Sequence, residues 1–129
     1  MRSSRLGLLA IIALSVFLTA NCSYMNRILS RKNLVEGSIA YKERKFEQAE
    51  ELFRKAAARD PEGATTEGRT AQIFLARTLH SRYIGNRQER QLAEDAIQAY
   101  KKALDVDKND QSSYKAVASL LDNLQRPDE

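Results

Sequence analysis

A pattern of small and aromatic residues that occurs twice constrains the fold of this chain more than any other feature. The segments KFEQAEELFRKAAARDPE (45–62) and LAEDAIQAYKKALDVDKN (92–109) align when Ala49 is placed opposite Ala96. The further matched pairs are Phe53 with Tyr100, Ala56 with Ala103, and Asp60 with Asp107. Residues three and four apart share one face of an α-helix. The pattern therefore predicts two helices, each with one face on which the alanines let a partner helix approach closely and the aromatic residue fills the space beside them.

This spacing resembles the second helix of the tetratricopeptide repeat, a family built from antiparallel helix pairs. In a first unit, residues 30–62, Gly37 matches the small residue at which the two helices cross, and Pro61 follows a helix that it cannot continue. In a second unit, residues 69–109, the first helix has Leu75, Ala76 and Leu79 in the matching roles. The resemblance implies an all-α fold, with helix pairs stacked as a short right-handed solenoid of about two and a half repeats.

The boundaries of the repeats follow from the segments between them. Residues 83–91 lengthen the second unit, and Gly85-Asn86 is the expected break between its helices. Residues 62–70 contain two glycines and are expected to form a mobile loop. Residues 111–124 repeat the first-helix pattern, and residues 125–129 read as a tail or as the start of a further helix. The helix over 111–124 is therefore either a lone cap or the front of a longer array.

The N-terminal segment has the features of an export signal. Residues 1–5 carry two arginines and no acid, and residues 6–20 are fifteen almost wholly apolar residues. As a helix this run would span roughly 22 Å at about 1.5 Å per residue, short of the roughly 30 Å hydrocarbon core of a bilayer. A basic start, a short apolar core and small residues at its end predict a signal peptide.

The residues at the end of the apolar run indicate how this signal is processed. Leu18-Thr19-Ala20-Asn21-Cys22 resembles a bacterial lipobox. The resemblance implies a signal peptide over residues 1–21, a covalent lipid on Cys22, and a short tether over residues 22–29. Uncleaved anchoring and ordinary cleavage with release remain as alternatives. Ser23 stands where Asp would favour inner-membrane retention in enteric lipoproteins, which favours the outer membrane over the inner one.

The residues after Cys22 are basic. Residues 23–35 contain Arg27, Arg31 and Lys32 and no acidic residue. They are expected either to rest against anionic head groups or to form a short solvated lead-in to the first helix.

Composition and motifs argue against catalysis, a metal site and nucleic-acid binding. The chain has one Cys and one His, too few for a disulfide framework or a zinc site. No nucleophile signature or phosphate-binding glycine loop occurs. The net charge is only +4, and acids and bases alternate along the expected helices. The chain is therefore expected to be no enzyme and to need no cofactor beyond the lipid on Cys22.

The expected function is that of a membrane-anchored adaptor or scaffold in a bacterial cell envelope, facing the periplasm. In the tetratricopeptide family the first helix of each pair lines a concave face that holds a peptide or a partner helix. Carried onto this chain, that lining is Leu34, Ser38, Tyr41, Lys42, Ile73, Arg77, His80, Lys115, Ser119 and Asp122. The partner is expected to be a protein or peptide, and self-association as a homo-oligomer is the alternative.

Overall fold

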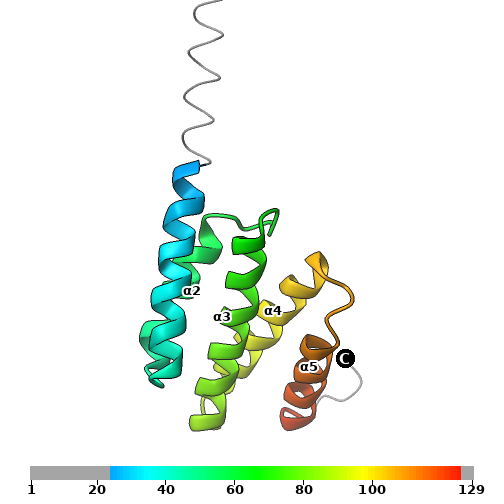
Figure 1. Ribbon diagram of the computed structural model, residues 1–129. Helices are drawn as coiled ribbons and strands as arrows, with labels where there is room; N and C mark the ends of the chain where they lie inside the picture. The colour runs from blue at the N-terminus through cyan, green and yellow to red at the C-terminus, as the bar shows by residue number, and fades with distance from the viewer. Residues whose placement is uncertain (1–23, 126–129) are drawn as a thin grey trace, which may run out of the picture.

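The computed structural model describes residues 24–125, which form five helices in sequence and, within that range, no strand (Figure 1). An N-terminal helix over residues 24–42 is followed by α2 (Phe46–Ala58), α3 (Thr66–Gly85), α4 (Arg90–Val106) and α5 (Gln111–Asn123). Consecutive helices run in opposite directions, and each packs against the next. The expectation of an all-α fold is confirmed for these residues. The expected signal peptide and Cys22 lie outside them.

Local sequence explains where the helices begin and how they are stabilised. The side chain of Thr65 caps α3 by accepting a hydrogen bond from the amide of Gly68, and Asp110 caps α5 by accepting from the amides of Ser112 and Ser113. Along α2, two pairs of opposite charge stand four residues apart, Glu50 with Arg54 and Glu51 with Lys55.

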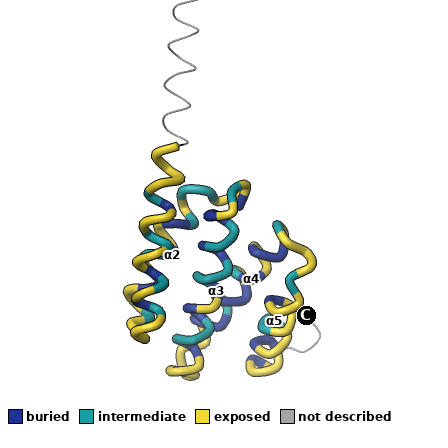
Figure 2. The backbone as a smooth tube through the Cα atoms, in the orientation of Figure 1, coloured by how far each residue is buried: buried dark blue, intermediate teal, exposed yellow. Residues whose placement is uncertain are grey.

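The residues that repeat in sequence form the core between neighbouring helices (Figure 2). The small and aromatic members of both copies are buried: Ala49, Phe53 and Ala56 in α2, and Ala96, Tyr100 and Ala103 in α4. A larger cluster joins α3, α4 and α5 through residues such as Leu79, Ile97 and Leu120. The packing role predicted for the repeated positions is therefore observed in both copies.

The N-terminal helix packs tightly on α2 at Gly37. A Cβ atom at this position would lie 2.8 Å from Cε1 of Phe53. The ring of Phe53 is fully buried and stacks on Phe74 of α3, with a centroid distance of 5.3 Å. Phe53 therefore fills the space between the N-terminal helix, α2 and α3.

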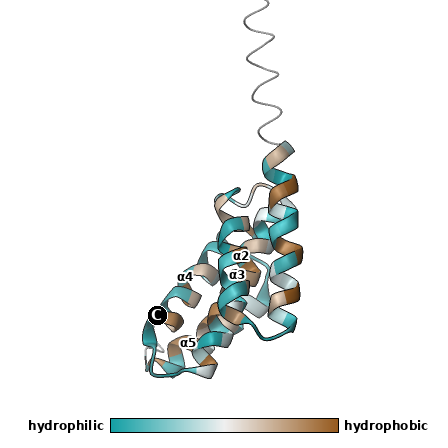
Figure 3. Cartoon of the chain, turned by 90° about the vertical axis from the view of Figure 1, so that its left-hand side faces the viewer, coloured by the Kyte–Doolittle hydropathy of each residue, from teal (hydrophilic) through white to brown (hydrophobic). Residues whose placement is uncertain are grey.

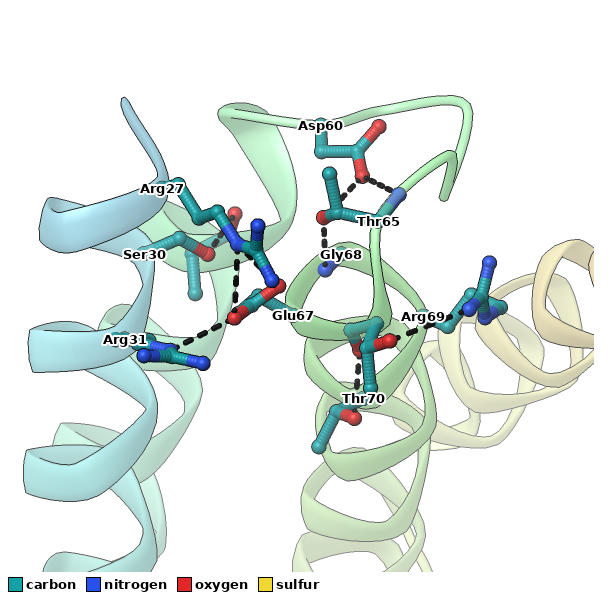
Figure 4. Close-up of polar contacts among 11 residues, drawn as sticks. Arg27, Ser30, Arg31, Asp60, Thr65, Glu67, Gly68, Arg69 and Thr70 are labelled. Atoms are coloured by element: carbon teal, nitrogen blue, oxygen red, sulfur yellow. Dashed lines mark hydrogen bonds and ion pairs between the residues drawn. The ribbon is translucent and has the colours of Figure 1, made fainter. Parts of the chain in front are cut away.

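A buried carboxylate joins the upper part of the N-terminal helix to α3 (Figure 4). Glu67 is 6% exposed, and its carboxylate accepts hydrogen bonds from the Nε–H of Arg27 at 3.2 Å and of Arg31 at 2.7 Å. Beside them, the hydroxyl of Ser30 donates to the carbonyl of Ala56 in α2. A bond to its own backbone amide lowers the pKa of Glu67, burial opposes this, and the two arginines lower it further.

Two boundaries differ from the sequence-based expectation. Residues 24–29, expected as part of a tether, are helical and continuous with the N-terminal helix, and Arg27 within them pairs with Glu67. The expected loop over 62–70 ends early, since α3 begins at Thr66. There the carboxylate of Asp60 accepts hydrogen bonds from the amide and hydroxyl of Thr65, and this fixes the start of the helix. The expected break at Gly85-Asn86 and the helix within 111–124 are both observed.

The close contact at Gly37 gives a first prediction. Gly37→Ala should lower the free energy of unfolding by about 1–3 kcal/mol, because the buried ring of Phe53 has no room to move. Gly85→Ala is the matched control, since a Cβ there meets nothing within 4 Å. It should be neutral or stabilising by up to about 1 kcal/mol. Urea unfolding followed by circular dichroism measures both, and equal stabilities would contradict the packing described.

The Glu67 cluster gives a second prediction, on pH. Because the folded-state pKa of Glu67 lies below its ordinary value of 4.5, its stabilisation is present above that value and is lost as pH falls through the folded-state pKa. Glu67→Gln should therefore cost about 1–3 kcal/mol at pH 7, and the difference from wild type should shrink under acid. Urea unfolding at several pH values measures it, with exposed Glu36→Gln as control. If the free energies of unfolding of wild type and Glu67→Gln differed by the same amount at every pH, the ionised Glu67 carboxylate would not be the stabilising group.

Candidate partner-binding surface

Tyr41 stands where the N-terminal helix, α2 and α3 meet. Its half-buried ring makes edge contacts with Phe46 of α2 and Phe74 of α3, at centroid distances of 5.4 and 6.4 Å. Its hydroxyl lies 3.1 Å from the Oγ of Ser81. These contacts hold the ring in one orientation, so the side chain needs little further ordering when a partner binds.

Arg77 lies on the same helix as Phe74 and Ser81. Its guanidinium carbon stands 5.6 Å from the centroid of the Phe74 ring, within the range of a cation–π contact. The residue as a whole is exposed. Because a guanidinium offers five N–H donors in a planar fork, Arg77 suits a carboxylate on a partner.

His80 and Tyr100 connect α3 to α4. Their rings meet edge-on at 6.1 Å, and the Tyr100 hydroxyl is 3.5 Å from Nδ1 of His80. Burial raises the pKa of Tyr100 to about 12, with Arg77 opposing the rise and Tyr41 and Asp110 adding to it. Burial also lowers the pKa of His80, and the positive charge of Arg87 lowers it further. Both rings are therefore neutral at pH 7, and the Tyr100 phenol keeps its proton.

We call this region the tyrosine surface: Tyr41, Arg77, His80 and Ser81 are exposed or partly exposed on it, and the buried Tyr100 of α4 supports it through its contact with the His80 ring. It draws on the N-terminal helix, α3 and α4. The ring of Phe74 joins two of these residues directly, since it contacts both the Tyr41 ring and the Arg77 guanidinium. The surface offers hydroxyl groups, one imidazole and one cation on a rigid aromatic base. These groups can form hydrogen bonds and an ion pair with a bound peptide.

The structure brings together some of the residues predicted to bind a partner and separates others. Tyr41, Arg77 and His80 belong to the tyrosine surface. Leu34 packs against the core around Phe53, and the Ser38 hydroxyl donates to the carbonyl of Leu34, so both serve the fold. Ile73 is half-buried and Lys42 is exposed. The remaining predicted residues, Lys115, Ser119 and Asp122, are exposed on α5, and no contact joins them to the tyrosine surface.

Sequence reasoning missed two members of this surface. Ser81 follows Arg77 by one helical turn, so the four-residue spacing could have identified it. Tyr100 was identified from the repeat as a packing residue only. Its hydroxyl reaches His80 because α4 crosses α3 there, and no spacing along the chain reveals that contact.

An open hollow of about 520 Å³ adjoins the surface at Ser81. It lies between the turn after the N-terminal helix and the turn between α3 and α4. Its lining includes Phe46, Ile84 and Leu92 together with charged groups of both signs, such as Arg44 and Glu89. The hollow extends the tyrosine surface toward the end of α3 and offers both apolar and polar contacts.

Comparison with protein-family models, with curated proteins and with solved structures found no match for this chain. Among residues 24–125, no helix is both long and apolar enough to cross a membrane. The same residues contain no group of three or more His, Cys, Asp or Glu side chains placed to hold a metal ion.

The environment of His80 gives a third prediction. Because the cation of Arg87 disfavours the imidazolium form, Arg87→Gln should raise the pKa of His80 toward its ordinary value of 6.5. Proton NMR of the imidazole as a function of pH measures the change, since the chain has a single His. Lys108→Gln removes an equal charge from the loop before α5 and should leave the titration unchanged. An identical His80 titration in wild type and Arg87→Gln would contradict the geometry.

Proposed function

We propose that this chain is a membrane-tethered adaptor of tetratricopeptide type, which binds a protein partner in a bacterial cell envelope. The observation that carries the proposal is the tyrosine surface, where side chains from the N-terminal helix and α3 present hydroxyls and a cation on packed aromatic rings. The lipobox-like sequence ending at Cys22 supplies the tether. The proposal assigns no catalytic step.

The packing supports the assignment to the tetratricopeptide type. Both copies of the repeated pattern bury their alanines and their aromatic residue against the preceding helix, as the family pattern requires. Gly37 and Ala76 are the small residues at the two crossings, and both are buried. These pairs stack in chain order, the arrangement expected when each repeat contacts only its neighbours.

The chemistry of the surface favours a partner segment that carries a carboxylate. Arg77 supplies a planar donor set for such a group. The Tyr41 and Ser81 hydroxyls can each donate or accept, which suits the polar backbone of an extended peptide. The adjoining hollow can receive an apolar side chain against Phe46 or Leu92.

A second candidate function, self-association, is favoured by one observation on α5. Ala118 holds the position in α5 that Gly37 and Ala76 hold in the earlier helices, but it is exposed where they are buried. Tyr114, one turn earlier, is 51% exposed. A helix from another copy could pack here. Light scattering distinguishes this candidate, since a monomer at high concentration would exclude it.

The adaptor proposal predicts that partner capture depends on Arg77. Full-length tagged protein is extracted from its native membrane in mild detergent, and co-purifying proteins are quantified. Arg77→Glu should reduce recovery of a near-stoichiometric partner at least tenfold, because reversing one charge of a desolvated pair costs about 2–5 kcal/mol. Lys101→Glu makes the same charge change at an exposed position on α4 and should keep the partner.

Two results would count against the adaptor. One is the absence of any near-stoichiometric partner with the wild-type chain. The other is a partner whose recovery is the same with Arg77→Glu and Tyr41→Phe as with wild type. Circular dichroism spectra of the variants confirm that each is folded.

A further inference from the structure

The outer face of the N-terminal helix is unusually apolar for an exposed surface. Seven large hydrophobic residues are exposed in the part of the chain that the structure describes, and five of them lie on this one helix. They are Tyr24, Met25, Ile28, Val35 and Ile39, with exposed fractions from 44% to 68%. Contiguous exposed apolar surface marks an interaction site more often than scattered residues do.

Helical geometry gathers these residues into a stripe. Tyr24, Ile28, Val35 and Ile39 are spaced by four, seven and four residues, which places them along one side of the helix, with Met25 at the edge. The stripe runs for roughly 22 Å at about 1.5 Å per residue. The helix packs on the domain through other positions, such as buried Ser30 and Ala40. Figure 3 shows hydrophobic segments along its whole length.

Two lysines share the side of the helix that carries this outer stripe. Lys32 follows Ile28 by four residues, and Lys42 follows Ile39 by three, so each lies among or beside the apolar side chains. Both are exposed, and Lys32 stands 4.0 Å from Glu36. Arg27 and Arg31 share the single carboxylate of Glu67, and Lys32 has Glu36 as its partner, so the basic side chains of this helix outnumber these carboxylates and leave a net positive charge.

This combination fits an anionic lipid surface better than a second copy of the chain. In a parallel pair of stripes, Lys32 of one copy would face Lys32 of the other, and the nearby Glu36 carboxylate already pairs with Lys32 of its own copy. At a bilayer, apolar side chains enter the boundary of head groups and acyl chains, while lysines extend to the phosphates. Each lysine near an anionic surface strengthens binding by about 1 kcal/mol, roughly fivefold.

The position of the stripe in the chain agrees with this partner. Tyr24 follows Cys22 by two residues, so a lipid on Cys22 would bring the first turn of the helix to the bilayer. We propose that the N-terminal helix lies along an anionic membrane surface through Tyr24, Ile28, Val35 and Ile39, with Lys32 and Lys42 at the head groups. The proposal rests on the membrane attachment in the proposed function, and it adds an orientation for the domain. The α5 end then points away from the bilayer, since α5 lies at the opposite end of the helix array (Figure 1).

The test places an environment-sensitive fluorophore on the full-length chain reconstituted in vesicles. The label is attached at Val35→Cys on the stripe or, as matched control, at Ala118→Cys on exposed α5. Vesicles contain phosphatidylcholine with about 30 mol % phosphatidylglycerol, or phosphatidylcholine alone, with a quencher on the acyl chains of some lipids. Labelling of the wild-type chain reports separately on Cys22, which reacts only if it carries no lipid.

The expected result is strong quenching at position 35 and little at position 118. Lys32→Glu with Lys42→Glu should weaken the quenching at 35 in the anionic vesicles. Equal quenching at the two positions, or none at 35, would overturn the proposal. Self-quenching between copies at position 35 would overturn it in favour of a dimer. If wild-type Cys22 takes up label, Cys22 carries no lipid and the proposed anchor is wrong. The comparison of positions 35 and 118 in a Cys22→Ser background then still tests the stripe.

Discussion

The stacking of Phe53 on Phe74 is the contact on which the rest of the molecule depends. Gly37 allows the N-terminal helix to approach the buried ring of Phe53, and that ring fixes the position of Phe74 on α3. Phe74 in turn contacts Tyr41 and carries Arg77 over its face. The core packing of the first helix pair thus sets the geometry of the surface that we propose binds a partner.

The N-terminal helix has two different sides, and the Glu67 cluster keeps both in place. One side enters the core at Gly37 and Ala40 and, one turn after Gly37, brings Tyr41 to the edge of that core. The outer stripe forms the other side, about 120° around the helix from Tyr41. Because Glu67 ties Arg27 and Arg31 to α3, the helix cannot rotate without leaving a buried carboxylate unpaired. Membrane contact and partner binding can therefore use one helix without competing for one surface.

Sequence reasoning predicted the helices and their core contacts better than the polar details. Ala49, Phe53 and Ala56 could be identified because helix packing repeats at a spacing visible in the chain. The break at Gly85 was visible because Gly and Asn disfavour helix. The early start of α3 was missed because it depends on the Asp60 carboxylate reaching Thr65. The helicity of residues 24–29 was also missed, and there Arg27 pairs with Glu67, which is distant in sequence. The Arg27–Glu67 contact depends on the tertiary fold, and no local pattern reveals it. Asp60 and Thr65 are only five residues apart, and a threonine that caps a helix is a local signal that could have been recognised.

A lipid on Cys22, as we propose, holds these helices at a membrane, and intact mass spectrometry of protein extracted from its native membrane measures that attachment. We expect a chain that begins at Cys22 and carries additional acyl mass. A chain that begins at Met1, or that begins near residue 22 without acyl mass, would contradict it.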